Sequence, residues 1–352
     1  MTKIIPTSKL DPSKIIIATQ CSPVEPFKSE VIRLFKSQDL LGGQLADAQK
    51  IVCLTEPADL DFKNELEELG VAIQSIEPID VSYPYSNKIQ MLQIEEDYDV
   101  LIALDTDIII TGDFSDYIDK NKISAKGVDT DCLGLENWEK LFKFFKLQMP
   151  SKRFQTSITN VETVPWFNSG VLFIPKKFSS ILYELWIQYT QKLLQNYNYL
   201  TFLSGDSFDD NSNFTFIEQY ALTLAIHDLK LPYNQLSLKF NFPTHYLVHE
   251  NFNPNEINPL IIHYHHLVSK KGNILHSKYL PTTKRIDLYN KSITTVSSDD
   301  NEIIIDDLYL SVLGRHADQE GLDYFMSLLS EQKISIDLIT KSLMNSDEFK
   351  NK

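Results

Sequence analysis

Long apolar runs, cysteine and positive charge are all scarce in this 352-residue chain. No apolar stretch of about 20 residues occurs and the segment Met1–Pro6 has no apolar core, so we expect neither a membrane span nor secretion. The three cysteines, Cys21, Cys53 and Cys132, are widely spaced and match no zinc pattern, which indicates reduced thiols in a cytoplasmic protein. With 33 Lys and Arg against 48 Asp and Glu, the net charge of −15 argues against binding to nucleic acid or anionic lipid.

The first 280 residues alternate short apolar runs with amphipathic segments, a succession typical of βαβ units and a mostly parallel sheet. We therefore expect an α/β fold. The predicted strands are Ile15–Ala18, Ile51–Leu54, Val71–Ile73, Val100–Leu104, Gly170–Pro175 and Ile261–His265. The predicted helices are a segment through Val31, Leu34 and Phe35, then Asp61–Leu69 ended by Gly70, Asn87–Ile94, Ser179–Leu194 and Thr215–Asp228.

The remainder of the chain differs in pattern. Periodicity is lost over about 281–300, where Thr, Ser, Asp and Lys gather, and this interval is predicted to be a linker between a domain at 12–280 and a module at 301–352. The module has the apolar spacing of helices and is predicted to be small and all-α. Its apolar positions are Ile304, Leu308, Val312, Leu322, Phe325, Leu329, Leu338 and Leu343.

The strand Val100–Leu104 runs directly into two acids, Asp105 and Asp107. Because side chains alternate along an extended backbone, the two carboxylates lean the same way and Thr106 the other. Such a pair repels unless a cation lies between its members, and a divalent metal carrying phosphates fits that place. A solvated turn is the alternative, whereas an EF-hand loop is excluded because its ligand spacing does not match.

Two further segments hold polar side chains suited to binding a sugar. Asn168 and Ser169 precede a glycine, so they indicate either close backbone approach to a sugar or an ordinary turn. Glu218 and Gln219 begin a helix, where Glu218 either faces substrate or completes a capping box with Thr215.

Histidines gather late in the chain. His263, His265 and His266 form the densest part of a cluster that includes His245 and His249, and His263 suits a third metal ligand, although a buried core histidine is the usual alternative. Lys270 and Lys271 follow it, either as phosphate contacts or as solvated surface residues.

In combination, these segments resemble the GT-A-fold glycosyltransferases, particularly family 8 and the glycogenin-like enzymes. The resemblance covers roughly Ile15–Leu275 and rests on five segments in matching order: Asn87-Lys88-Ile89, Tyr98–Asp107, Phe167–Val171, Glu218-Gln219 and Ile262–Tyr264. It implies a Rossmann-like, mostly parallel sheet flanked by helices. It also implies a nucleotide-sugar donor, as in a UDP-sugar, a glycan or other hydroxyl acceptor, and Mn²⁺ or Mg²⁺ as cofactor.

The resemblance further implies a role for each matching residue. Asp105, Asp107 and His263 would hold the metal on the donor diphosphate. Lys88 would face the donor, Asn168 and Ser169 the sugar, and Thr19 and Gln20 the base and ribose. The implied donor-binding residues are Thr19, Gln20, Lys88, Asp105, Thr106, Asn168, Ser169 and Lys271, and the implied catalytic residues are Glu218, Gln219 and Asn168.

Two regions set the chain apart from that pattern. After His263, the segment Val268–Gly272 does not reproduce the His-x-x-Gly-x-x-Lys-Pro-Trp ending of family 8. The resemblance is therefore weakest for the identity of the phosphate-binding lysine and for the stereochemical class. The tail is similar to a short helical module of unknown function found on many bacterial glycosyltransferases, and it is a candidate contact for a protein partner.

The resemblance therefore implies a metal-dependent bacterial hexosyltransferase that acts with retention. Inversion, with Glu218 as the base, is the stereochemical alternative. A catalytically idle GT-A-fold protein that binds a glycan or a partner is the main functional alternative. A sugar nucleotidyltransferase ranks last, because Thr19–Pro23 is not the glycine- and arginine-rich phosphate loop that it requires.

Overall fold

The structure, a computed structural model, describes residues 10–199, 215–245, 247, 249, 252–253, 256–293, 301–330, 339–340, 342–343, 346 and 348. Its centre is a seven-stranded sheet in the spatial order β10-β6-β9-β4-β1-β2-β3. Neighbouring strands are parallel except β9, which runs antiparallel to β4 and β6, so the prediction of a mostly parallel sheet is confirmed. The strands are β1 (Ile15–Cys21), β2 (Gln49–Thr55), β3 (Val71–Ile76), β4 (Val100–Leu104), β6 (Ile123–Gly127), β9 (Phe167–Pro175) and β10 (Tyr233–Leu236).

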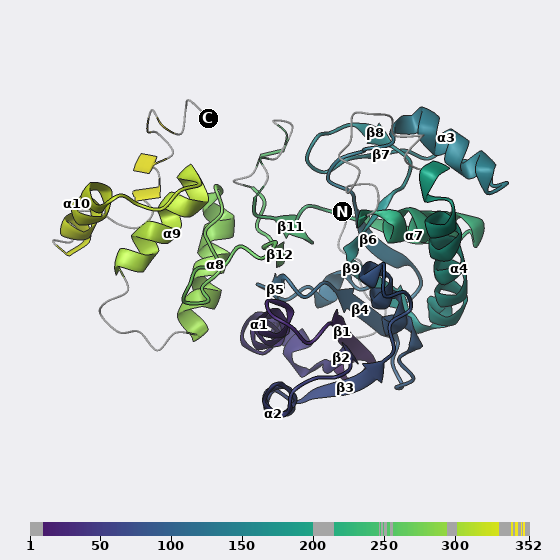
Figure 1. Cartoon of the computed structure of the whole chain (residues 1–352), viewed down its shortest axis with the longest axis horizontal. Helices are drawn as coiled ribbons and strands as arrows, with labels where there is room; N and C mark the ends of the chain where they lie inside the picture. Colours follow the sequence, from purple (N-terminus) through teal and green to yellow (C-terminus); the bar gives the residue numbers. More distant parts are fainter. Residues whose placement is uncertain are drawn as a thin grey trace.

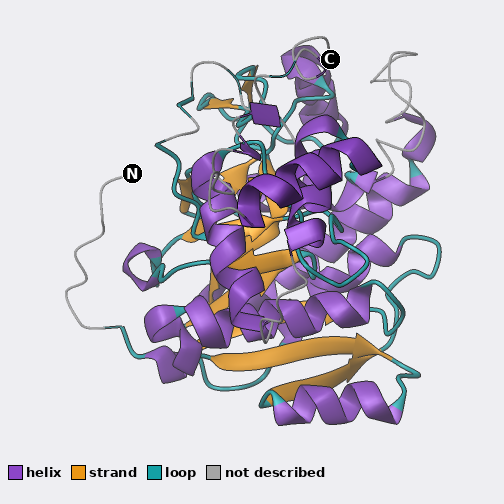
Figure 2. Cartoon of the chain, turned by 90° about the vertical axis from the view of Figure 1, so that its left-hand side faces the viewer, coloured by secondary structure: helices purple, strands orange, loops and turns teal. Residues whose placement is uncertain are grey.

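Helices cover both faces of the sheet (Figures 1 and 2). On one face pack α1 (Phe27–Leu41) and α2 (Leu60–Glu68), and on the other α4 (Lys176–Gln195) and α7 (Ile217–Asp228). Alternate β1 residues divide between the two cores, with Ile16 on the α4 and α7 side and Ile17 on the α1 side. A strand covered on both faces needs apolar residues throughout, which explains the unbroken apolar runs of the sequence.

Shorter elements complete the sheet domain. The 3-10 helices are η1 (Pro12–Lys14), η2 (Gly43–Asp47), η3 (Pro84–Gln93) and η4 (Ser115–Tyr117), and α3 spans Gly134–Phe144. A second sheet contains β11 (Phe242–Pro243), β12 (Ile261–His263) and β5 (Ile108–Ile110), and a third contains β7 (Phe154–Gln155) and β8 (Glu162–Thr163).

The segment before β4 winds more tightly than predicted. We expected an α-helix over Asn87–Ile94, and the structure has the 3-10 helix η3 at Pro84–Gln93. Two side chains here bond to backbone groups: Ser86 Oγ donates to the Tyr83 carbonyl, and Asn87 Oδ1 accepts from the Ile79 N–H. Such local bonds compete with a regular α-helical ladder.

The predicted linker is wrong for residues 281–293, because α8 spans Leu280–Ile293. This helix packs through Ile286 and Tyr289 into a small core with Ile109 and Ile262 of the second sheet. Its buried face also includes threonines, and Thr283 Oγ1 donates to the Ser277 carbonyl at 2.8 Å. Threonines on a core face break an apolar pattern, which is why the helix was missed. Residues 294–300 lie outside the described part of the chain.

The tail contains α9 (Asn301–Leu313) and α10 (Gln319–Ser330), which lie beyond α8 from the sheet (Figure 1). Ile304, Leu308, Val312, Leu322, Phe325 and Leu343 all belong to one separate hydrophobic cluster, as the apolar spacing predicted. The side chains of Leu329 and Leu338 fall outside the described residues. Across the described part, no helix combines the length and the apolar character needed to cross a bilayer.

Candidate active site

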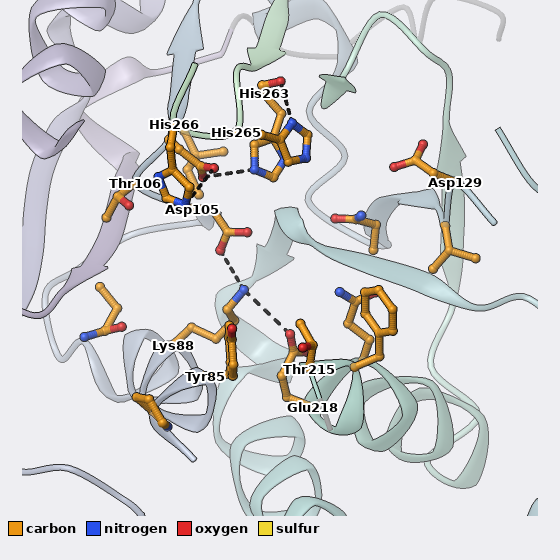
Figure 3. Close-up of a pocket in the computed structure, with 18 of the residues that line it drawn as sticks. Tyr85, Lys88, Asp105, Thr106, Asp129, Thr215, Glu218, His263, His265 and His266 are labelled. Carbon is orange, nitrogen blue, oxygen red and sulfur yellow. Dashed lines mark hydrogen bonds and ion pairs between the residues drawn. The ribbon is translucent and has the colours of Figure 1, made fainter. Parts of the chain in front are cut away.

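A pocket of about 560 Å³ opens where β1 and β4 end (Figure 3). Gln20 of β1, Lys88 of η3, Asp105 after β4, Glu218 of α7 and His263 of β12 all line it. Ligands of open α/β sheets bind beyond the carboxyl ends of the strands, so this is the expected place for a substrate.

Strand pairing brings the acids and the histidine together. The chain passes from β4 to β5 through Asp105-Thr106-Asp107, and β5 pairs antiparallel with β12 so that His263 lies opposite Ile108. As a result His263 Nε2 is 2.9 Å from Asp107 Oδ1. Potential ligand atoms of Asp105, Asp107 and His263 all lie within 4.8 Å of one another.

Asp107 and His263 shift each other's pKa as the two members of an ion pair do. Burial alone would raise the pKa of Asp107, but His263 outweighs it and the pKa is lowered. Burial likewise opposes a charge on His263, yet the neighbouring Asp107 raises the pKa of that imidazole. Two carboxylates and an imidazole are donors that fit Mn²⁺ or Mg²⁺, so the residues present can hold such a cation.

Gly170 leaves the space that Asp105 occupies. A Cβ atom at Gly170 would lie 2.8 Å from Asp105 Oδ2, closer than atoms pack without a shift. The Gly170 carbonyl also accepts from the Asp105 N–H at 3.0 Å. The sequence predicted a close approach of the Gly170 backbone to a sugar. In the structure, the group that lies close to Gly170 is the carboxylate of Asp105.

Lys88 lies between two carboxylates on the opposite side of the pocket (Figure 3). Its Nζ atom is 2.6 Å from Asp105 Oδ1, 3.7 Å from Glu218 Oε1 and 3.2 Å from Ser169 Oγ. Burial lowers the pKa of this ammonium, but Asp105 and Glu218 outweigh burial and raise it overall. The lysine therefore carries its charge across the neutral pH range.

Glu218 is 2% exposed and accepts from Ser169 Oγ at 2.9 Å. Burial raises the pKa of this carboxyl to about 7, with Lys88 opposing the shift and Asp105 adding to it. The capping-box alternative is wrong, because α7 begins at Ile217 with Phe216 as its N-cap and has no side-chain cap. The side chain of Glu218 is instead directed to Ser169 and Lys88, which turns it toward the pocket.

Four pocket side chains each have a buried polar atom without a hydrogen-bond partner among the described residues. They are Gln20 Nε2, Trp166 Nε1, Glu218 Oε2 and Gln219 Oε1. Leaving a buried polar group unpaired costs free energy, and a polyhydroxylated ligand would supply the missing partners.

Asn168 is held within the site. Its Oδ1 accepts from the Gly170 N–H at 2.8 Å and from Asn241 Nδ2 at 2.7 Å, and the residue lines the pocket. Thr106 also lines the pocket, although its hydroxyl turns away and donates to Glu30 Oε2 at 2.7 Å.

Three predicted donor contacts do not line the pocket. Thr19 is fully buried, because side chains alternate along β1 and Gln20 takes the pocket side. Ser169 is 2% exposed and lies behind Lys88 and Glu218. Lys271 is exposed in the turn that follows Ser269, and neither it nor Lys270 reaches the pocket.

Several residues of the site were not predicted. Glu30 of α1 and Asn241 bond to site side chains from distant parts of the chain, and no local pattern marks them. His265 stacks on His263 with ring centroids 3.8 Å apart, and burial lowers the pKa of His265 to about 2. The density of histidines was the signal for His265 and His266.

Asp129, Trp166 and Phe216 also line the pocket, as does His245, whose ring lies 4.0 Å from that of His265. Asp129 Oδ1 is 2.5 Å from the ammonium of Lys126, a side chain only 1% exposed. Its carboxylate also accepts from Ser157 Oγ. This acid is therefore paired with a buried lysine that does not line the pocket.

Comparison with known proteins identifies two regions. The model of the Rhodobacterales glycosyltransferase domain matches residues 44–230, and that of a domain of unknown function, DUF4214, matches residues 290–352. No curated protein matches.

Solved structures share the fold. The galactosyltransferase LgtC, in complex with donor and acceptor sugar analogs, is 14% identical, with a TM-score of 0.50 over 81% of this chain and 98% of that chain. An active-site mutant of LgtC gives 13% identity, the same coverage and a TM-score of 0.50. The glycosyltransferase GlyE of Streptococcus pneumoniae is 16% identical over 80% of this chain and 61% of that chain, with a TM-score of 0.46. The two LgtC structures confirm the predicted GT-A fold.

Proposed function

Because the chain belongs to the Rhodobacterales glycosyltransferase domain family, which matches just over half of it, we propose that it transfers a sugar from a UDP-sugar to a hydroxyl acceptor with the help of a divalent cation. The observation that carries this proposal is the cluster of Asp105, Asp107 and His263 in a pocket that also holds polar atoms without a partner in the described part of the chain. A cation site beside groups that lack hydrogen-bond partners suits a molecule with both a diphosphate and sugar hydroxyls.

The acids and the histidine would hold Mn²⁺ or Mg²⁺. When bound, such an ion would act as a Lewis acid that offsets the negative charge of the leaving diphosphate. Lys88 adds a fixed positive charge on the other side of Asp105, at 2.6 Å. The protein thus offers local positive charge to a polyanion despite its net charge of −15.

The sugar would bind between Asn168, Glu218 and Gln219. Within the described residues, Glu218 Oε2 and Gln219 Oε1 are acceptors without partners, so they suit sugar hydroxyl donors. Gln20 Nε2, near the end of β1, is a donor that none of the described residues pairs, and it suits a carbonyl or ribose oxygen of the nucleotide. In this arrangement Ser169 orients Glu218 and does not itself contact the donor.

We propose retention of configuration, as the resemblance to family 8 implies. The acceptor hydroxyl would then attack on the face from which the diphosphate leaves, so no carboxylate base is required opposite it. Both other carboxylates that line the pocket away from the cation cluster are engaged: Asp129 with Lys126, and Glu218 with Ser169 and Lys88.

The test incubates the full-length protein with a panel of nucleotide sugars and hydroxyl acceptors, with Mn²⁺ or with a chelator. We expect nucleotide release and a glycosylated product only with the metal, and NMR of the new bond reports its configuration. The matched control is Asp105→Asn with Asp107→Asn, for which we expect no product. If no donor is consumed and calorimetry detects no nucleotide binding, the idle binding-protein alternative replaces this proposal.

We further propose that 12–280 forms the catalytic unit and 301–352 a helical module that contacts a protein partner. The separate hydrophobic cluster of α9 and α10 and the match to DUF4214 support such a division. Cys21, Cys53 and Cys132 are free and buried, which supports a reducing cytoplasmic location, and the name of the matched family supports a bacterial enzyme.

A further inference from the structure

A second histidine approaches the same carboxylate as His263. His266 Nε2 lies 3.9 Å from Asp107 Oδ2, whereas His263 Nε2 lies 2.9 Å from Asp107 Oδ1. Both rings line the pocket, and Figure 3 shows them above Asp105. Two imidazoles therefore face the two oxygens of one acid.

Each of these rings is held in the same way through its other nitrogen. His263 Nδ1 is 2.8 Å from Asn241 Oδ1, and His266 Nδ1 is 2.5 Å from Glu30 Oε1. Since both partner oxygens are acceptors, each Nδ1 carries a proton, and each Nε2 lies on the side of Asp107. A histidine that binds a metal usually donates its second N–H to a carboxylate or carbonyl in this manner.

Glu30 is placed specifically for this contact. It lies on α1 and is only 1% exposed, and its second oxygen accepts from Thr106 Oγ1 at 2.7 Å. A buried carboxylate is costly unless it is paired and hydrogen-bonded. Glu30 thus connects His266 to the residue that lies between Asp105 and Asp107 in the sequence.

The backbone also brings His266 back over the pocket. His265 and His266 have φ values of 48° and 62°, in the left-handed region that side chains other than glycine seldom adopt. The turn replaces the expected continuation of the strand beyond His263 and returns both rings to the site. Lys270 and Lys271, which follow, do not line the pocket, so His266 is the last residue of this segment that does.

We propose that His266 is a fourth protein ligand of the divalent cation, with Glu30 as its positioning residue. This inference rests on the cation site of the proposed function. Ligands of one ion with bonds of about 2.1 Å lie roughly 3 to 4 Å apart, a range that includes the 3.9 Å between His266 Nε2 and Asp107 Oδ2. Two imidazoles beside two carboxylates favour a transition-metal ion such as Mn²⁺ over Mg²⁺, which prefers oxygen ligands.

The experiment measures metal binding without nucleotide. Metal-free full-length protein is titrated with MnCl₂ and, separately, with MgCl₂ by calorimetry. We expect His266→Ala to weaken Mn²⁺ binding about 10- to 100-fold, and Glu30→Gln to weaken it by about 10-fold. Mg²⁺ affinity should change less than Mn²⁺ affinity in both variants. Pulsed electron paramagnetic resonance of bound Mn²⁺ should detect two imidazole nitrogens in the wild type and one in His266→Ala.

Controls separate this inference from the proposal on which it rests. Lys271→Ala, an exposed change five residues further along the same segment, should leave both metal affinities unaltered. His266 is half exposed (52%), so its variant remains a valid test even if the buried Glu30→Gln change prevents folding. Unchanged Mn²⁺ affinity in His266→Ala would overturn the inference, and this holds even if the variant bound Mn²⁺ less tightly in the presence of UDP. The proposed site of Asp105, Asp107 and His263 would not be affected by that result. If the wild type binds Mn²⁺ neither alone nor with UDP, both ideas fail.

Discussion

The pocket neutralises its carboxylates differently on its two sides. The imidazole side consists of Asp107, His263, His266 and Glu30. The lysine side consists of Asp105, Lys88, Ser169 and Glu218. On the imidazole side the partners of the acid can release a proton and bind a metal, whereas on the lysine side the partner is an ammonium with a raised pKa.

This difference assigns separate tasks to two acids that are only one residue apart. Asp107 is 9% exposed and surrounded by histidines, so a metal can replace their protons without leaving a buried charge unpaired. Asp105 is 26% exposed and shared between the metal cluster and Lys88. Variants on the imidazole side should therefore change metal affinity first, and variants on the lysine side should change the rate first.

Asp107→Asn should have the largest effect. Removing this carboxylate takes away a metal ligand and leaves His263 without its acid, so we expect Mn²⁺ affinity to fall by more than about 100-fold, beyond the loss typical of an outer-shell change, and transfer to fall with it. Calorimetry and initial rates measure the two quantities. Asp129→Asn, at another acid that lines the pocket, is the matched control, and it should keep the Mn²⁺ affinity of the wild type. Equal losses of Mn²⁺ affinity in Asp107→Asn and Asp129→Asn would show that Asp107 is not a specific ligand of the cation.

Lys88→Met should reverse the pattern. Its removal takes a positive charge from between Asp105 and Glu218, so we expect the transfer rate to fall by about 100-fold, the scale of losing one electrostatic stabiliser. Mn²⁺ affinity should hold or increase, because Asp105 no longer has an ammonium as a competing partner. The check is a rate series at rising Mn²⁺ concentration. Recovery of the rate at high Mn²⁺ would place Lys88 with the metal ligands instead.

Glu218→Gln should make stability less dependent on pH. The pKa of Glu218 is raised from 4.5 to about 7, chiefly by burial, so between these values the folded protein holds a proton that the unfolded chain has lost. The free energy of unfolding of the wild type should then fall as the pH rises through this interval, by an amount on the order of 2 kcal/mol. The glutamine variant should lack this decrease.

Urea denaturation at about pH 5 and pH 8 measures the difference, and Glu68→Gln on the exposed end of α2 serves as the control. A wild type and a Glu218→Gln variant that lose equal stability between the two pH values would show that Glu218 is not the group responsible. The activity of Glu218→Gln should fall in either case, since the residue faces the proposed sugar site.

The sequence was sufficient to nominate the three residues of the candidate cation cluster, Asp105, Asp107 and His263. Asp105 and Asp107 follow a strand whose apolar run is unmistakable, and the order of motifs along the chain led to His263 about 160 residues later. Glu30 and Asn241 were beyond reach, because their contacts depend on how α1 packs and on the path of the chain before β12. The path of a loop is equally hard to predict from sequence. Lys271 follows the histidines closely in the sequence, yet it is exposed and lies outside the pocket.

Thr19 and Gln20 give the smallest and most local test. The resemblance implied that both bind the nucleotide, but β1 directs only Gln20 to the pocket. We expect Gln20→Ala to weaken UDP binding about 3- to 10-fold, the value of one net hydrogen bond. Thr19→Val should leave UDP affinity within about 2-fold and raise the free energy of unfolding by up to about 1 kcal/mol, because Thr19 Oγ1 is buried without a partner in the described structure. Calorimetry measures the UDP affinity of the two variants, and urea denaturation measures their free energy of unfolding. Weaker UDP binding in Thr19→Val would mean that the end of β1 rearranges when the nucleotide binds. The imidazole side and the lysine side would then not include every residue that contacts the donor.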